Sequence, residues 1–164
     1  RLAVLAARPD MTIHLGDCWA DAEKLAAMFP EIPLEQVAGN CDFRPGAPLE
    51  KLLELGGKRV LVCHGHAYGV KDGLLGAGYA AEEKRADVFL FGHTHRPFLE
   101  RRGSALFMNP GSVGEWRSPS YGVLTIENGS ASGELFAAGP LRRADISATT
   151  AAAGRVSREK TANS

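Results

Sequence analysis

The chain has 164 residues, 45% of them hydrophobic, and its 19 Lys and Arg side chains balance 19 Asp and Glu side chains. This length suffices for one domain with a buried core, and a formal charge of zero gives no electrostatic reason to expect nucleic acid as a partner. The three cysteines form no C-x-x-C pair, and no apolar run approaches the roughly 20 residues of a membrane-spanning helix. We therefore expect a protein of the reducing cytoplasm with no membrane partner.

The two ends of the chain differ from its middle. The first ten residues, RLAVLAARPD, predict the last turns of an amphipathic helix, so the chain is interpreted as a fragment. Residues 141–164 lack apolar periodicity and are rich in Ala, Ser, Thr and charge, a composition that cannot bury enough surface to order itself. The expected organisation is one domain over residues 1–140 followed by a disordered tail.

Strands and helices are predicted to alternate through the first half of the chain. Strands are indicated by alternating or continuous apolar residues, and helices by apolar residues at helical spacing with Pro or Gly at their ends. The expected elements are a strand at 11–15, a helix at 22–29, a strand at 34–40, a helix at 48–55, a strand at 59–65, a helix ending near 80–86 and a strand at 88–94. This alternation predicts an α/β fold.

Beyond Pro97 the pattern changes to short apolar runs. ALFMNPG, YGVLTIENG and SGELFAAG are separated by Gly, Asn and Ser turns with no helix between them, which predicts an antiparallel meander. The apolar side chains of these strands, including Phe107 and Phe136, are candidates for a surface that pairs subunits into a homo-oligomer.

Four predicted strands end in a polar side chain that can bind metal. These side chains are Asp17, Asn40, His64 and the pair His93 and His95. Ligands of open α/β sheets bind outside the carboxyl ends of the strands, so these residues are expected to converge on one rim. Any one of them is more often a cap or turn former, but all together indicate a site. Mixed oxygen and nitrogen donors suit Mn, Fe, Zn or Ni better than Ca.

The loops that carry these residues, and the loop 108–114, have features that are typical of loops that bind anions. A glycine stands in each of the former loops, at positions 16, 39, 65 and 92, where it allows a sharp turn, although plain loop punctuation explains it equally well. In the loop 108–114, backbone N–H groups and Ser112 could face a phosphate. His66 follows His64 by two residues and is a candidate for a ligand, a substrate contact or, as we favour, a hydrogen-bond donor behind the ligands.

The motifs G-D, G-N-C-D, H-G-H, G-H-T-H and N-P-G-S follow one another in this chain. In that order they resemble the calcineurin-like metallophosphoesterase superfamily, especially its small bacterial and archaeal phosphodiesterases, over about residues 10–140. The resemblance implies an α/β/β/α fold, in which two β-sheets are sandwiched between helices. It also implies hydrolysis of a small phosphodiester or other phosphate ester by a hydroxide that two divalent metal ions activate.

The resemblance also implies a role for each motif residue. Asp17 would bridge two metal ions, Asn40, His64 and His93 would complete the shell of one ion, and His95 would bind the other. Cys41 stands where many members have a histidine that protonates the leaving oxygen, and the small phosphodiesterases commonly carry cysteine there. Asp42 is expected to orient this loop or to assist. Cys41, Asp42 and His66 are therefore the candidate catalytic residues.

One motif of the family, D-x-H on its first strand, does not occur in the sequence. It would supply the remaining ligands of the ion bound by His95, so we expect this chain to have little or no activity. Two other functions stay open. One is a non-catalytic interaction scaffold or inactive fragment, since the same fold serves as a scaffold in the retromer complex. The other is hydrolysis of phosphomonoesters or cyclic nucleotides.

Overall fold

The computed structural model describes residues 2–44, 46–115 and 117–139, so the expected tail at 141–164 lies outside the described residues. The elements in chain order are α1 (Leu2–Ala7), β1 (Thr12–His14), α2 (Trp19–Met28), β2 (Leu34–Gln36), β3 (Glu50–Leu55), β4 (Lys58–Cys63), the short 3-10 helix η1 (His66–Tyr68), α3 (Leu75–Glu83), β5 (Val88–Leu90), β6 (Pro97–Arg102), β7 (Ala105–Pro110), β8 (Ser120–Glu127) and β9 (Ser130–Ala137). No helix among the described residues is long and apolar enough to cross a membrane.

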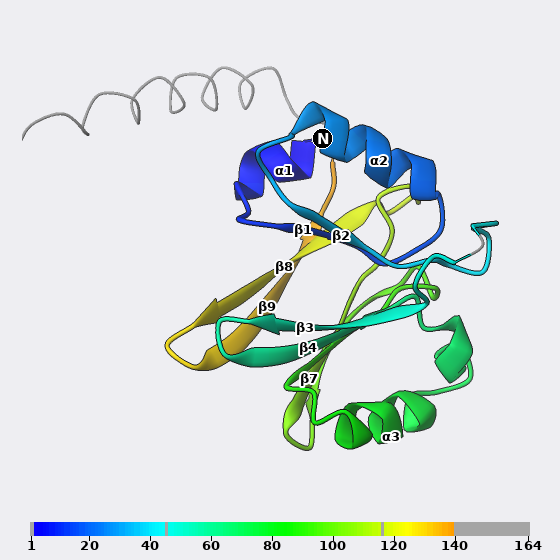
Figure 1. Ribbon diagram of the computed structural model, residues 1–164, viewed down its shortest axis with the longest axis vertical. Helices are drawn as coiled ribbons and strands as arrows, with labels where there is room; N and C mark the ends of the chain where they lie inside the picture. Colours follow the sequence, from blue (N-terminus) through cyan, green and yellow to red (C-terminus); the bar gives the residue numbers. More distant parts are fainter. Residues whose placement is uncertain (1, 45, 116, 140–164) are drawn as a thin grey trace, which may run out of the picture.

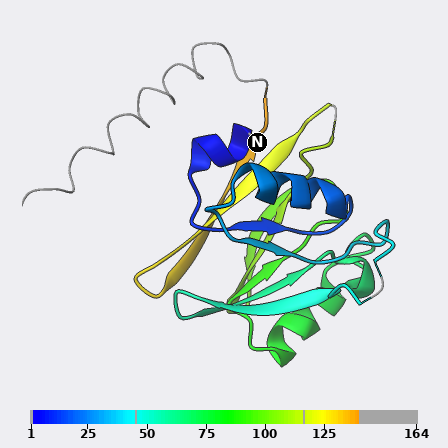
Figure 2. The same ribbon diagram turned by 45° about the horizontal axis from the view of Figure 1, so that its top comes forward.

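Helices and strands are stacked in four layers (Figures 1 and 2). A five-stranded sheet in the order β3-β4-β5-β7-β6 carries α3 on one face. Its other face packs on a second layer, made of the parallel pair β1-β2 and the antiparallel pair β8-β9, and α1 and α2 lie beyond that layer. The α/β/β/α fold is thus confirmed, with the second layer divided into two hydrogen-bonded pairs.

The central strands of the five-stranded sheet are buried on both faces. Its central strands β4, β5 and β7 run parallel to one another and are almost continuously apolar, as expected for parallel strands covered on both sides. On the α3 side, Phe89 and Phe107 stack with their ring centroids 5.1 Å apart over the alanines of the helix. The opposite face contributes Val60, Val62 and Val88 to the core beneath β1 and β8.

The predicted helix at 48–55 is wrong, because this segment forms strand β3 in a hairpin with β4. Leu52, Leu53 and Leu55 fit helical spacing, but Leu53 and Leu55 also alternate, and both pack on the core below the second layer. Gly56 and Gly57 have φ of 54° and 76° and close the hairpin with a two-residue turn. Gly56 and Gly57, which were predicted to end a helix, therefore form the turn of a β-hairpin.

The predicted antiparallel meander is also only partly correct. β8 and β9 pair antiparallel, but β7 runs parallel to β5, and the additional strand β6 pairs antiparallel with β7. Phe107 is 1% exposed and belongs to the core, so the prediction that it lies on a subunit-pairing surface is wrong. Phe136 is 38% exposed and stacks on Tyr121.

Candidate metal centre

Polar side chains from four different loops meet at one rim of the molecule. Asp17 follows β1, Asn40 follows β2, His64 follows β4 and His93 follows β5. The other three side chains lie around the ring of His64, which is 2% exposed. The rim lies at the carboxyl ends of parallel strands, where ligand sites of α/β sheets form.

The ring of His64 is oriented from behind by a backbone carbonyl. Its Nδ1 lies 2.7 Å from the carbonyl oxygen of Leu15. A carbonyl only accepts hydrogen bonds, so Nδ1 carries the hydrogen and donates it. Burial lowers the pKa of His64 below 6.5, although the Leu15 carbonyl and the charge of Asp17 act to raise it. The ring is therefore neutral at pH 7, and Nε2 presents a lone pair to the rim.

Three further polar atoms crowd around His64 Nε2. Asn40 Oδ1 and His93 Nδ1 each lie 3.1 Å away, and Asp17 Oδ2 lies 3.5 Å away. His93 can donate a hydrogen bond to His64 Nε2. The oxygens of Asn40 and Asp17 cannot, and Nε2 carries no hydrogen that it could donate to them. Lone pairs that converge in this way repel one another. A cation among them would turn the repulsion into coordination.

The spacing of these atoms agrees with ligands of a single ion. Nitrogen and oxygen ligands lie about 2.0–2.2 Å from Zn and so roughly 3.0–3.4 Å from one another in tetrahedral or octahedral shells. Within the described part of the chain, no three His, Cys, Asp or Glu side chains are arranged to hold a metal as they stand. The fit rests instead on the contacts of His64 Nε2, among them the amide of Asn40.

Two carboxylates tie together the loops that follow β1 and β2. Asp17 Oδ1 accepts the N–H of Cys41 at 2.9 Å. Asp42 accepts the N–H of Trp19 and of Gly39, both at 2.9 Å. Burial raises the pKa of the Asp42 carboxyl, but the backbone N–H groups outweigh burial, and the pKa lies below 3.8. Asp42 is therefore ionised at neutral pH and links the two loops through these hydrogen bonds, while its expected catalytic role stays a prediction.

Gly39 allows the two loops to approach this closely. A Cβ atom on Gly39 would fall on the Asp17 carboxylate, and a Cβ on Gly16 would lie 2.7 Å from His64 Nδ1. A side chain at position 39 would displace Asp17, and a side chain at position 16 would displace His64. The close approach of the two loops therefore explains why glycine stands at positions 16 and 39 better than a general preference of glycine for turns does.

His93 and His95 both have left-handed backbone conformations, with φ of 65° and 57°. Such a conformation costs a non-glycine residue roughly 1–2 kcal/mol and persists only where surrounding contacts impose it. Here the buried amide of Asn109 donates to the carbonyl of Gly92 at 2.8 Å and to Thr94 Oγ1 at 3.0 Å. His95 is exposed, and its ring makes no hydrogen bond within the described residues.

Asn109 is a site residue that the sequence prediction missed. In the loop 108–114 the prediction selects Ser112, whose Oγ accepts the N–H of Gly114 at 3.2 Å. The available signal was the asparagine of N-P-G-S, which follows four apolar residues and lies near the end of β7. Its partners, Gly92 and Thr94, are more than a dozen residues away, so sequence spacing gave no sign of the contact.

His66 and Cys41 flank the converging donors. The ring centroid of His66 lies 5.4 Å from that of His64 and 6.1 Å from that of His93. Its Nδ1 is buried without a hydrogen-bond partner in the described structure. Cys41 is exposed, and the negative charge of Asp17 raises the pKa of its thiol above 9.0. The thiol therefore keeps its proton at neutral pH.

Comparison with known proteins gives matches over most of the chain. A family model described as the calcineurin-like phosphoesterase superfamily domain matches residues 1–129. The probable metallophosphoesterase YsnB of Bacillus subtilis is 41% identical over 134 residues, which cover 79% of this chain and 76% of YsnB. The phosphodiesterase YfcE of Escherichia coli K12 is 33% identical over 115 residues, covering 62% of this chain and 58% of YfcE.

Solved structures superpose on most of the chain. A predicted phosphoesterase from Streptococcus pneumoniae TIGR4 superposes with a TM-score of 0.67 at 27% identity, covering 83% of this chain and 82% of the other. Vps29 from Entamoeba histolytica gives a TM-score of 0.64 at 19% identity, covering 85% and 90%. At that identity, the likeness to Vps29 demonstrates a common fold only.

Proposed function

Because the chain belongs to the calcineurin-like phosphoesterase superfamily, we propose that it is a divalent-metal-dependent phosphodiesterase whose metal centre is the rim around His64. The observation that carries this proposal is the convergence of Asn40, His93 and Asp17 on His64 Nε2, at 3.1, 3.1 and 3.5 Å. A neutral imidazole surrounded by oxygen and nitrogen lone pairs is suited to a cation. We propose Mn, Ni, Zn or Fe, because mixed nitrogen and oxygen ligands favour these ions.

Two ions are proposed, with unequal ligand sets. Asp17, Asn40, His64 and His93 would hold one ion, and Asp17 and His95 would contribute to the other. When bound, the ions would supply positive charge that lowers the pKa of water and stabilises phosphoryl oxygens. The D-x-H motif that the family uses for the second ion is not among residues 1–164.

Cys41 and His66 are proposed to act on the substrate beside the ions. The protonated thiol of Cys41 is positioned by the bond between its own N–H and Asp17, and it can donate a proton to the leaving oxygen. A thiol is a weaker acid than an imidazolium, so diesters with good leaving groups would react fastest. His66 would offer its unpartnered Nδ1 to a phosphoryl oxygen or to the ligands.

The proposed substrate is a small phosphodiester, and the proposed setting is the cytoplasm. The relative YfcE is named a phosphodiesterase, which supports a diester over a monoester. Cys18, Cys41 and Cys63 are all free thiols in the structure, which supports a reducing compartment.

Hydrolysis of bis(p-nitrophenyl) phosphate, measured with and without Mn²⁺ or Ni²⁺, tests the proposal. The protein from the complete reading frame is used, with p-nitrophenyl phosphate as the monoester comparison. Asp17→Asn should lower kcat at least about 100-fold, since the carboxylate contacts the centre directly. Asp21→Asn is the matched control, because Asp21 lies exposed on α2 and pairs only with Lys24 among the described residues.

Two outcomes would overturn the proposed activity. One is the absence of metal-stimulated hydrolysis of either ester by folded protein, which would favour a non-catalytic module of the same fold. The other is a faster reaction with the monoester than with the diester. That result would replace the diesterase with a phosphomonoesterase.

A further inference from the structure

A cavity of about 170 Å³ lies at the opposite end of the five-stranded sheet from the metal centre. It is lined by Lys58 at the start of β4, Asp87 before β5, Arg101 and Ser104 of the β6–β7 hairpin, and the β8–β9 turn from Gly129 to Ala131. His64 follows the other end of β4, so at about 3.3 Å per strand residue the cavity lies roughly 20 Å from the rim. The cavity is therefore separate from the centre described above.

The carboxylate of Asp87 and the carbonyl of Ala131 in this cavity already accept hydrogen bonds. Asp87 Oδ1 accepts from Lys58 Nζ at 3.0 Å, and its Oδ2 accepts from the N–H of Arg59 at 2.9 Å. The Arg59 N–H and the Lys58 ammonium hold the pKa of Asp87 below 3.8, so the carboxylate is ionised at neutral pH. The carbonyl of Ala131 accepts from an amino group of Arg101 at 2.6 Å.

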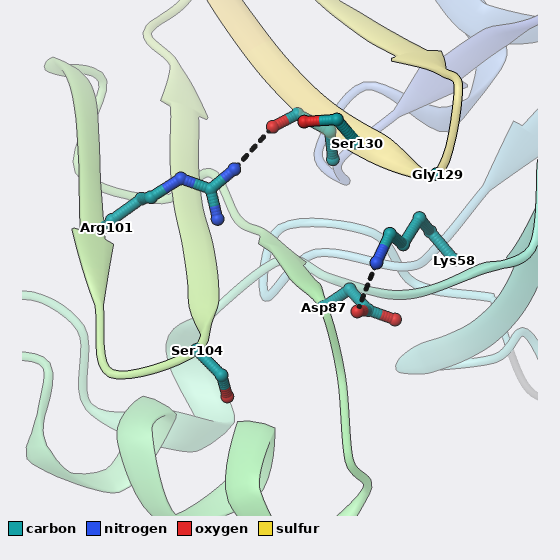
Figure 3. A pocket seen from close by; sticks show the side chains of 7 residues that line it. Lys58, Asp87, Arg101, Ser104, Gly129 and Ser130 are labelled. Atoms are coloured by element: carbon teal, nitrogen blue, oxygen red, sulfur yellow. Dashed lines mark hydrogen bonds and ion pairs between the residues drawn. The ribbon is translucent and has the colours of Figure 1, made fainter.

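Donors, in contrast, are left over. A guanidinium has five N–H donors and an ammonium three, and the bonds described occupy only one on Arg101 and one on Lys58. Figure 3 shows Arg101 and Lys58 extending toward each other from two different elements, with Ser104 in the turn of the β6–β7 hairpin. Ser130 adds a second hydroxyl to the lining. With two cations and one carboxylate, the lining carries a net charge of one positive unit.

We propose that this cavity binds a small anion of the phosphate class, either inorganic phosphate or the phosphate group of a small metabolite. A tetrahedral anion accepts hydrogen bonds in several directions at once, which matches donors that come from the β6–β7 hairpin, from β4 and from the β8–β9 turn. Arg101 would bind it with paired N–H groups and Lys58 as a point charge. The volume exceeds the roughly 30 Å³ of one water several times, so the cavity has room for such an anion.

The test is an NMR titration of labelled protein in EDTA, so that ions at the rim contribute nothing. Inorganic phosphate and glycerol 3-phosphate are added in separate arms. We expect saturable shifts at the amides of Ser104, Gly129 and Ser130. Equal affinity in the two arms assigns recognition to the phosphate group alone, and tighter binding of the ester assigns the site to an organic phosphate.

Ser104→Asp places a carboxylate among the free donors and should weaken phosphate binding about tenfold or more. Ser118→Asp, at an exposed position before the start of β8, introduces the same charge at the opposite end of that strand from the cavity and should leave the affinity unchanged. Thermal denaturation of both variants verifies that they are folded. The proposal fails if the two variants bind phosphate equally, if neither ligand gives saturable shifts, or if shifts appear only at Gly16 and Gly39. None of these results bears on the proposed esterase activity, which is assayed with metal present.

Discussion

Asp42 shows how a single residue can shape the site without facing its centre. Its carboxylate accepts two backbone N–H groups and so fixes the loops that carry Asp17 and Asn40. An asparagine can accept only one of these bonds well, because its NH₂ group would face the other N–H. The side chain therefore acts through its neighbours, as ligand-orienting groups of metal sites do.

We predict that Asp42→Asn lowers metal affinity or kcat about 10- to 100-fold, the usual effect of losing a group that orients ligands. The free energy of unfolding should fall by about 1–3 kcal/mol, because a buried N–H loses its acceptor. The pKa of Asp42 is lowered on folding, so its contribution is present above pH 3.8 and is lost as the pH falls through the folded pKa. Urea unfolding from neutral pH into acid should show variant and wild type converging. Asp10→Asn, at an exposed position, serves as control.

At the scale of elements, the β3–β4 hairpin provides a sharp comparison between neighbouring glycines. Both have positive φ, but a Cβ on Gly56 would lie 2.7 Å from Ile126 Cγ2 of β8, whereas a Cβ on Gly57 would meet nothing within 4 Å. The turn of the five-stranded sheet therefore packs directly on the second layer through Gly56.

We predict that Gly57→Ala costs about 1–2 kcal/mol of unfolding free energy from backbone strain alone. Gly56→Ala should cost roughly 1–3 kcal/mol more, because the added methyl group overpacks against Ile126. Equilibrium urea denaturation of the two variants measures the difference. Equal losses would show that the layers are not in contact at this turn.

At the scale of the whole molecule, the metal centre joins loops from both β layers. The loops after β1 and β2 belong to the second layer, and those after β4 and β5 to the five-stranded sheet. A ligand that binds only the folded state raises its stability by mass action. Ion binding at the rim should therefore stabilise the packing of the two layers on each other.

We predict that Mn²⁺ added to EDTA-dialysed protein raises Tm, with a gain of about 2.7 kcal/mol at an ion concentration of 100 times Kd. His93→Ala should remove most of this rise, because it deletes one donor at His64 Nε2. Tyr79→Ala, at a 65% exposed position on α3, should keep the full rise. A Tm that does not respond to any divalent ion would contradict the proposed centre.

The sequence by itself determined which polar residues stand near the ends of the predicted strands. Residue type and local order are sufficient for this, since Asp17, Asn40, His64 and His93 each stand within two residues of the end of a predicted strand. The same local patterns could not separate strand from helix at 48–55, because its leucines fit both periods and only packing against the second layer selects the strand. Tertiary structure also decided the chemistry of the rim. The carbonyl of Leu15 lies 49 residues before His64, yet it fixes which ring nitrogen faces the other donors, and such contacts exist only once the layers pack together.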